Sequence, residues 1–205
     1  MNNILPSWKN VFKKGFQQKY IELVIYSYKE TIKMERTNIK PWENTRRNML
    51  LSQMREHKGQ FGITFNIASE VGVFDEQYKD SGRIDICCYL SQLEQQYIAF
   101  ECKRFLKKDI VPSYIREEYY GEGIRRFEEN IYADSIDFGG MIAFLEEGDF
   151  QKLWGKLLCE LSQYSCNNCV DDLSENYQYQ YVLKTYHKRK QNTNITLNHI
   201  LMDFT

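Results

Sequence analysis

Three charged residues interrupt two otherwise apolar segments of the chain. Asp85 lies between two isoleucines, and Glu101 and Lys103 lie two positions apart in the segment 97–103. Side chains alternate between the two faces of a β-strand, so Glu101 and Lys103 are expected to point the same way. If the two segments pair as neighbouring strands, Asp85 can lie beside Glu101. The pattern therefore predicts a cluster of two carboxylates and one lysine in an apolar setting.

Two carboxylates side by side are suited to binding a divalent cation. Burying such charges is costly unless they are paired or hold a metal ion. Mg²⁺ usually takes one or two carboxylates together with waters and phosphate oxygens. It polarises a phosphate and lowers the pKa of a bound water, which a neighbouring lysine can orient or deprotonate. The pattern alone has low specificity, so the surrounding elements must supply the rest.

The apolar periodicity predicts elements that would position this cluster. Pro41 separates two N-terminal helices, and the segment 79–82 has the composition of a turn. In chain order we expect helices at 7–37 and 42–57; strands at 63–70, 83–90 and 97–103; a helix at 115–130; a strand at 141–145; a helix at 150–164; and strands at 179–186 and 195–204. This order predicts a mixed α/β domain with a central sheet.

The segments Gly82–Ile86 and Ala99–Lys103 resemble the PD-(D/E)XK nuclease superfamily, whose members have a restriction-endonuclease-like fold. The core of that fold is a helix, a three-strand meander, a helix and a strand, and the predicted order from about 43 to 145 is similar. The resemblance implies an α/β fold and a single nuclease-like domain over 1–205. It would have a helical extension at 1–40, a catalytic core at 41–145, and a C-terminal helix with two additional strands at 146–205. One departure is that isoleucine, rather than proline, precedes Asp85.

The resemblance also implies roles for individual residues. Asp85 and Glu101 would bind Mg²⁺, with Mn²⁺ as a substitute, the Cys102 carbonyl would add a ligand, and Lys103 would assist the attacking water. Members often carry a further acid on the first core helix or on the strand before the aspartate. Glu43 and Glu70 match these two places. Glu70, at the end of a predicted strand, is slightly favoured, whereas Glu43 also fits a first-turn acid stabilised by the helix dipole.

A second pattern is similar to one in small bacterial proteins of this type. It consists of Tyr119, Gly123, Arg126, Phe127 and Tyr132. Arg126 is a candidate phosphate contact. The alternative is a surface ion pair with Glu122, four residues earlier on the same helix.

Charge and hydropathy limit the class of protein. Lys and Arg number 27 and Asp and Glu 28, for a net charge of −1, so the chain as a whole is not basic. Basic stretches at 46–58, 103–108 and 184–190 are either phosphate-facing surfaces or simply solvated faces. No apolar run approaches the roughly 20 residues needed to span a bilayer, and no segment is typical of a secretory signal. We therefore expect a cytoplasmic protein with reduced thiols and no membrane partner.

The cysteines and histidines carry weaker signals. Cys166 and Cys169 form a Cys-x-x-Cys pair, but a zinc site needs further ligands at suitable spacing, and a thiol redox motif needs a different element order. His187 is expected at a basic edge or on the surface, and His199 is expected to be a satisfied core histidine. Three cysteines in apolar strand segments are expected in the core, namely Cys87, Cys88 and Cys102.

The sequence thus favours a metal-dependent nuclease that acts on nucleic acid, DNA rather than RNA, as in a defence or restriction context. A competing hypothesis is a nuclease-like fold that serves as a binding or regulatory subunit and depends on a partner protein. A homodimer would suit cleavage of both strands of a duplex, and the sequence leaves this open. Sequence specificity, and endonuclease against exonuclease action, are not encoded in any motif of the chain.

Overall fold

A mixed seven-stranded sheet forms the centre of the molecule. The computed structural model describes residues 15–34, 42–74, 80–89, 97–133, 136–177 and 180–205, and the strand order in this part is β1-β2-β3-β4-β7-β6-β5. The strands are β1 Asn66–Phe74, β2 Asp80–Tyr89, β3 Tyr97–Phe105, β4 Phe138–Leu145, β5 Val170–Asp172, β6 Val182–Lys188 and β7 Asn194–Asp203. β1, β2 and β3 form an antiparallel meander, β3, β4 and β7 run parallel, and β6 and β5 continue antiparallel. The predicted mixed α/β class and the three-strand meander are confirmed.

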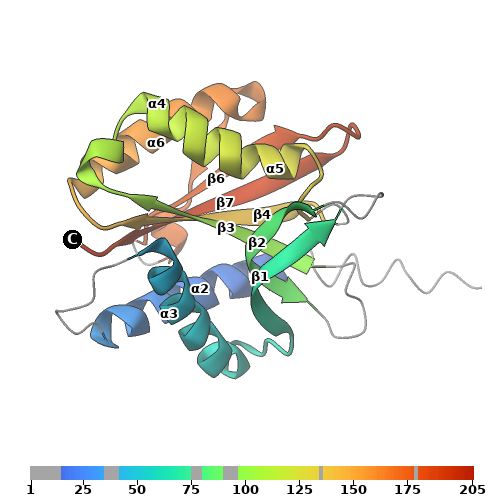
Figure 1. Cartoon of the computed structure of the whole chain (residues 1–205), viewed down its shortest axis with the longest axis vertical. Coiled ribbons are helices and arrows are strands. Elements are labelled where there is room, and N and C mark those ends of the chain that lie inside the picture. The colour runs from blue at the N-terminus through green and yellow to red at the C-terminus, as the bar shows by residue number, and fades with distance from the viewer. Residues whose placement is uncertain (1–14, 35–41, 75–79, 90–96, 134–135, 178–179) are drawn as a thin grey trace, which may run out of the picture.

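Helices cover both faces of this sheet (Figure 1). On one face lie α2 Gly15–Met34 and α3 Glu43–His57; on the other lie α4 Pro112–Tyr114, the π-helix η3 Ile115–Ile124, α5 Arg125–Glu128 and α6 Phe150–Tyr164. Short 3-10 helices are η1 Lys58–Phe61, η2 Lys107–Asp109, η4 Cys166–Asn168 and η5 Ser174–Tyr177. Each face has its own hydrophobic core. The predicted first helix extended over 7–37, of which 7–14 and 35–37 lie outside the described residues.

The central strands are apolar on both faces because both faces are covered. Every residue of β4 is buried, and β3 is buried from Ile98 to Cys102. Cys87, Cys88 and Cys102 are buried free thiols, as predicted. A charge placed in β3 must therefore be compensated by other protein groups or by a ligand.

Three strand predictions differ from the structure. β1 continues to Phe74, so Glu70 lies in the middle of this strand and not at its end. The three-residue strand β5 was not predicted, because two of its residues are aspartates, which are depleted in strands. β6 begins at Val182, and 178–179 of its predicted range lie outside the described residues.

The helix η3, which lies over Lys103, has an unusual backbone. Residues 115–124 form a π-helix, a rare conformation that is often found at functional sites. A Cβ at Gly123 would lie 2.6 Å from Met141 Cε and 3.6 Å from Lys103 Cε. Glycine at this position lets the π-helix pack directly over β4 and over the Lys103 side chain.

The basic stretch of α3 and η1 makes internal contacts, which corrects the interpretation of it as simply a solvated face. Arg46 and Arg47 are buried, and each of the four cations in this stretch binds an acidic side chain or a backbone carbonyl of the sheet or its edge. The pairs are Arg46 with Glu146 at 2.7 and 2.9 Å, Arg47 with Asp85 at 2.8 Å, Arg55 Nε with the Ile67 carbonyl at 2.7 Å, and Lys58 Nζ with the Phe65 carbonyl at 2.5 Å. These contacts attach α3 to the sheet, and Arg46 and Arg47 are withdrawn from the solvent, whereas Arg55 remains exposed.

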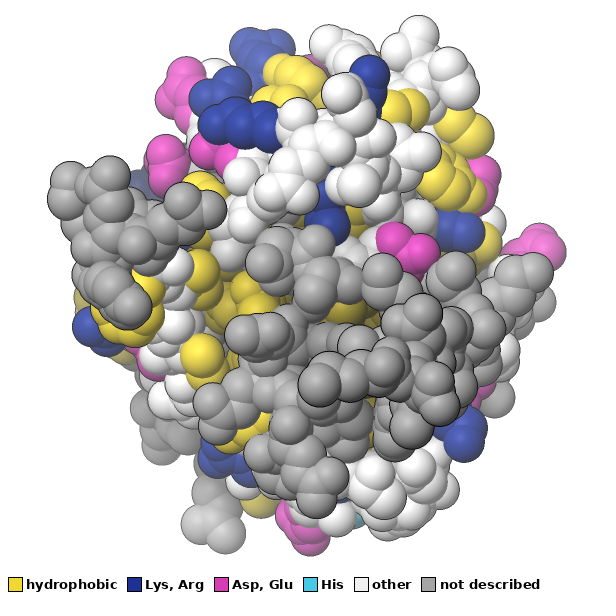
Figure 2. All heavy atoms as spheres, turned by 90° about the vertical axis from the view of Figure 1, so that its right-hand side faces the viewer, with side chains coloured by type: hydrophobic (Ala, Val, Ile, Leu, Met, Phe, Trp, Pro, Cys, Tyr) yellow, Lys and Arg dark blue, Asp and Glu magenta, His cyan; other side chains and the backbone are white. Residues whose placement is uncertain are grey.

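The described surface carries mixed charge. On the face shown in Figure 2, Lys and Arg side chains stand in small groups with Asp and Glu side chains beside or between them. This distribution agrees with the net charge of −1. Among the described helices, none has the length and apolar character that crossing a membrane requires.

Candidate functional site

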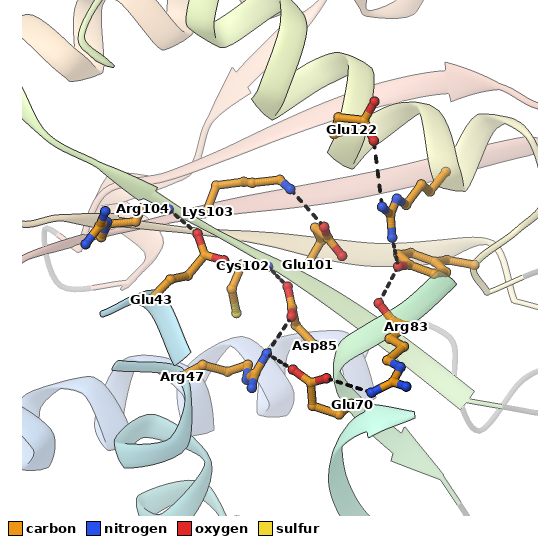
Figure 3. A network of polar contacts seen from close by, with 12 residues as sticks. Glu43, Arg47, Glu70, Arg83, Asp85, Glu101, Cys102, Lys103, Arg104 and Glu122 are labelled. Carbon is orange, nitrogen blue, oxygen red and sulfur yellow. Dashed lines mark hydrogen bonds and ion pairs between the residues drawn. The ribbon is translucent and has the colours of Figure 1, made fainter. Parts of the chain in front are cut away.

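The strands β2 and β3 separate at the predicted acidic pair. Their paired positions end at Ile86 opposite Phe100. Continuing that register by one residue places Asp85 opposite Glu101, but here the ladder stops, and Asp85 Oδ2 accepts a hydrogen bond from the Cys102 amide at 2.8 Å. We call the point where β2 and β3 separate, at Asp85 and Glu101, the fork. Figure 3 shows the two carboxylates there. The predicted convergence of Asp85 and Glu101 is therefore present in the structure.

Glu70 lies in the same row, one strand further out. In the β1–β2 ladder, Ser69 pairs with Ile86 and Val71 with Ile84, so Glu70 is level with Asp85 without being paired to it. Glu70 has a φ of 56°, in the left-handed region, which is uncommon for a residue other than glycine.

The strands also exchange faces at this row. Ile67 and Ile86 pack in the core under α2 and α3, whereas Ile84 packs in the opposite core with Val71 against it. Strict alternation would place Ile84 and Ile86 on one face. The irregularity at Glu70 and Asp85 therefore re-aims both strands, as β-bulges do beside active sites.

Glu101 and Lys103 point to the same face and touch, as predicted. Lys103 Nζ lies 3.1 Å from Glu101 Oε1, and Glu101 is only 4% exposed. Glu101 Oε2 is buried and has no hydrogen-bond partner in the described part of the chain. Burial, followed by the negative charge of Asp85, raises the pKa of Glu101 to about 7, while Lys103 and Arg126 act in the opposite direction. At neutral pH this carboxyl group thus titrates, and a cation would compete with its proton.

Glu43 approaches the fork from the first turn of α3. Its Oε2 accepts a hydrogen bond from the Arg104 amide at 2.8 Å, so its side chain bridges the start of α3 and the end of β3 (Figure 3). Burial raises the pKa of Glu43 and the charge of Asp85 contributes in the same direction, whereas the Arg104 amide and Lys103 lower it. Glu43 therefore senses both Asp85 and Lys103, which a solvent-facing first-turn acid would not.

Arg47 is a site residue that sequence reasoning missed. Its guanidinium group lies 2.8 Å from Asp85 Oδ1 and 2.5 Å from Glu70 Oε1, and Glu70 lies 3.6 Å from Arg83. Arg47 follows Glu43 by four residues and so shares its helix face, a signal that could have placed both at the fork. The structure thus ties Glu70 to Asp85 through an arginine, while Glu43 approaches from the other side.

The second sequence pattern lies above the fork. Arg126 donates to the hydroxyl of Tyr132, which donates to the Arg83 carbonyl at 2.5 Å, and Glu122 lies 3.7 Å from Arg126. The pair with Glu122 is therefore present, but Arg126 also lies close enough to affect the charge of Glu101. Tyr119 and Phe127 are fully buried in the core beneath the helix. Tyr119, Gly123 and Phe127 thus hold the helix in place, and Arg126 and Tyr132 link it to β2.

A second buried polar cluster, which we name the histidine chain, lies beyond β4 on the face of the sheet that η3, α5 and α6 cover. It comprises Glu128, His187, Thr185, His199 and Tyr119. Successive contacts measure 2.9 Å from Glu128 to His187 Nδ1, 2.7 Å from His187 Nε2 to Thr185 Oγ1, 2.7 Å from Thr185 Oγ1 to His199 Nε2, and 3.1 Å from His199 Nδ1 to the Tyr119 hydroxyl.

The histidine chain confirms one prediction and corrects another. His199 is a satisfied core histidine, and burial lowers its pKa well below the ordinary value. His187, expected at the surface, is only 1% exposed. It is buried because β6 pairs with β7 inside the sheet and because Glu128, 59 residues away in the chain, supplies its partner.

The remaining cysteines do not join a cluster. Cys166 is half-buried and Cys169 is exposed at the end of α6, where Cys169 Sγ lies 3.7 Å from Asp171 Oδ1. Throughout the described residues, no group of three or more His, Cys, Asp or Glu side chains is arranged to hold a metal ion. Asp85 and Glu101 with a backbone carbonyl form a smaller set, which suits Mg²⁺ because this ion keeps several of its waters.

Comparisons with protein-family models, with curated proteins and with solved structures found no match for this chain. The function of this chain must therefore be inferred from the chemistry of the fork itself.

Proposed function

We propose that this chain is a metal-dependent nuclease that hydrolyses phosphodiester bonds, in DNA in preference to RNA. The observation that carries the proposal is the fork between β2 and β3. There Asp85, Glu101 and Lys103 converge, and one buried oxygen of Glu101 has no hydrogen-bond partner among the residues that the structure describes. A structural ion-pair network would satisfy its buried oxygens. A site that receives a cation during its reaction cycle has reason to leave one unsatisfied.

The residues at the fork fit a hard divalent cation. Asp85, Glu101 and the Cys102 carbonyl would hold Mg²⁺ or Mn²⁺. We favour Glu43 over Glu70 as the additional acid, because Glu70 is half exposed and already paired with Arg47 and Arg83. Bound there, the cation would polarise the scissile phosphate and lower the pKa of a water.

Lys103 has the position of an assisting group. Its ammonium lies against Glu101 and under the π-helix, where burial strengthens its effect on nearby charge. It would orient the attacking water and offset the negative charge that develops on the phosphate. Arg47 fixes the orientation of Asp85 through their contact at 2.8 Å.

Cleavage of plasmid and linear DNA with Mg²⁺, Mn²⁺ or EDTA tests the proposal, with RNA as the second substrate. We expect cleavage that requires the cation and falls by roughly a hundredfold or more in Asp85→Asn and Lys103→Met, as for loss of an acid–base or electrostatic group. Lys108→Met, which removes an exposed cation five residues further on, is the matched control and should cleave normally. If Asp85→Asn and Lys103→Met cleave DNA as fast as the control and the unmodified protein, the site assignment is wrong.

One observation favours a second candidate, a nuclease-like subunit that needs a partner protein. Both oxygens of Asp85 already accept hydrogen bonds, from Arg47 and from the Cys102 amide. If these contacts persist, the isolated chain binds cations weakly. Calorimetric titration with Mn²⁺ separates the two candidates. Mn²⁺ binding that is lost in Glu101→Gln favours the nuclease. No Mn²⁺ binding, or binding that Glu101→Gln leaves unchanged, favours the subunit.

A further inference from the structure

An exposed tryptophan stands at the edge of the fork. Trp42 is the residue before α3 and is 68% exposed, the most exposed of the large hydrophobic side chains in the described part of the chain. Its chain neighbour Glu43 reaches into the fork. Trp42 is therefore the chain neighbour of a residue whose carboxylate hydrogen-bonds the end of β3 beside the fork. A large apolar ring at such a position has no role in either hydrophobic core.

Arg104 accompanies this ring. Its guanidinium carbon lies 5.8 Å from the centroid of the indole, within the range of a cation–π contact. Arg104 follows Lys103 on β3, and alternation turns its side chain to the other face. In Figure 3 Arg104 extends away from Asp85 and Glu101, on the far side of Glu43. The indole and the guanidinium group thus flank the site on the side where α3 begins.

The backbone beneath both side chains is fixed. The Trp42 carbonyl accepts hydrogen bonds from the amides of Thr45 and Arg46. The Arg104 amide donates to Glu43, and its carbonyl accepts from the Tyr114 hydroxyl at 3.0 Å. Side chains that recognise a ligand are most effective on such rigid supports.

We propose that Trp42, with Arg104, is a stacking platform for one unpaired nucleobase of the substrate strand, next to the scissile phosphate. This inference rests on the proposed nuclease function and deepens it. Every base has an aromatic face that stacks on tryptophan without regard to sequence, and arginine adds a cation–π and phosphate contact. Within a duplex each base face is covered by its neighbours, so a platform beside Glu43 selects a single strand.

The test compares binding of a fluorescein-labelled strand of twelve thymidines with binding of a twelve-base-pair duplex, measured by anisotropy. Asp85→Asn, which stops cleavage, is the common background. Adding Trp42→Ala should weaken binding of the single strand by about 5- to 100-fold, the range known for base–aromatic stacking, and leave the duplex unaffected. Trp42→Phe should retain affinity within a few-fold. Phe74→Ala, which removes another exposed ring at the end of β1, should change nothing.

Indole fluorescence measures stacking directly and would not change if Trp42 had only a structural role. Stacking of the thymidine strand should quench part of the emission, and Trp42→Phe should bind the strand without that quenching. Unchanged single-strand affinity in Trp42→Ala, with normal circular dichroism, overturns the platform, as does an equal loss on the duplex. If affinity is unchanged and light scattering shows a smaller particle, the ring contacts another copy of the chain and the platform is again overturned.

Failure of this inference is distinguishable from failure of the proposed function. Metal-dependent cleavage of DNA that Trp42→Ala leaves unaltered on single strands removes the platform and keeps the nuclease. Absence of both cleavage and binding in the unmodified protein removes both.

Discussion

The carboxylate cluster at the fork and the histidine chain are both buried, yet they differ in how fully their polar atoms are satisfied. In the histidine chain, one assignment of protons satisfies every member. Tyr119 donates to His199, His199 to Thr185, Thr185 to His187, and His187 to Glu128. None of its five residues has a left-handed backbone, and none has a buried side-chain atom without a partner in the described structure.

The carboxylate cluster has the opposite properties. Glu101 Oε2 and Arg47 Nε are buried without partners among the described residues, and Glu70 has a left-handed backbone. The π-helix lies over it, and the strands separate beneath it. Strain and unsatisfied groups persist where the surrounding structure enforces them, and they concentrate at functional sites. Burial of ionisable groups is thus common to both regions. The fork differs in that an unsatisfied buried carboxylate oxygen, a left-handed residue and a π-helix occur together there.

The largest expected difference concerns metal binding by the two additional acids. Glu43→Gln should weaken Mn²⁺ binding at least about tenfold, the cost known for groups that support metal ligands. Glu70→Gln should change it only a few-fold, because Glu70 contacts Arg47 and Arg83 rather than Asp85. Calorimetric titration at pH 8, where Glu101 is ionised, measures both. A larger effect at Glu70 would reverse our assignment and restore the preference drawn from the sequence.

The histidine chain should respond to substitution through stability and not through activity. Thr185→Val removes the hydroxyl between two ring nitrogens, and each orphaned group costs roughly 1–3 kcal/mol, so we expect a loss of about 2–4 kcal/mol in the free energy of unfolding. Thr185→Ser keeps the hydroxyl and should lose less than about 1 kcal/mol, for one methyl group. Urea unfolding followed by circular dichroism measures this. Cleavage per folded molecule should stay normal at low temperature, and a loss there would place the chain within the catalytic machinery.

The two regions should respond to acid with opposite signs. His199 is neutral when folded and has a pKa near 6.5 when unfolded, so only the unfolded state gains its proton below that pH, and stability falls on acidification. Glu101 has a pKa raised to about 7, so the folded state gains its proton first as pH falls from 7 towards 4.5, and stability rises. Each effect approaches about 1.4 kcal/mol per pH unit.

Unfolding in EDTA between pH 7.5 and 5 separates these contributions. Glu101→Gln should steepen the loss of stability on acidification, because the opposing contribution of Glu101 is removed. His199→Gln should flatten or invert it. Identical pH profiles for both variants and the unmodified protein would show that neither group changes its proton affinity on folding.

The parts of the fold that could be predicted are those encoded locally. Long apolar runs identified β2, β3 and β4, and helical periodicity identified α3 and α6, because buried strands and amphipathic helices leave period-specific patterns. Alternation along β3 correctly joined Glu101 to Lys103. The acid at 85 and the acid at 101 could be brought together because a meander needs only a short connection.

The parts that could not be predicted depend on partners distant in the sequence or on irregular backbone. Arg46 and Arg47 looked alike in the sequence, yet one binds Glu146, 100 residues away, and the other binds Asp85. In the sequence His187 stands in a basic run, and only the pairing of β6 with β7 shows that it is buried. The exchange of faces at Glu70 breaks the alternation rule itself, so no pattern of period two could have revealed it.

The smallest expected effect tests that irregularity directly. At φ 56° a side chain at position 70 is strained, and glycine is not, so Glu70→Gly should be more stable than Glu70→Ala by about 0.5–1 kcal/mol. Both variants lose the same ion pairs, which at this half-exposed position contribute at most about 1 kcal/mol, so their difference isolates the backbone. The same pair of substitutions at Val71, where the backbone is ordinary β-strand, should favour alanine instead. If alanine is the more stable residue at both positions, the strand does not hold a left-handed residue at 70, and the contrast between a strained fork and a relaxed histidine chain fails at its structural origin.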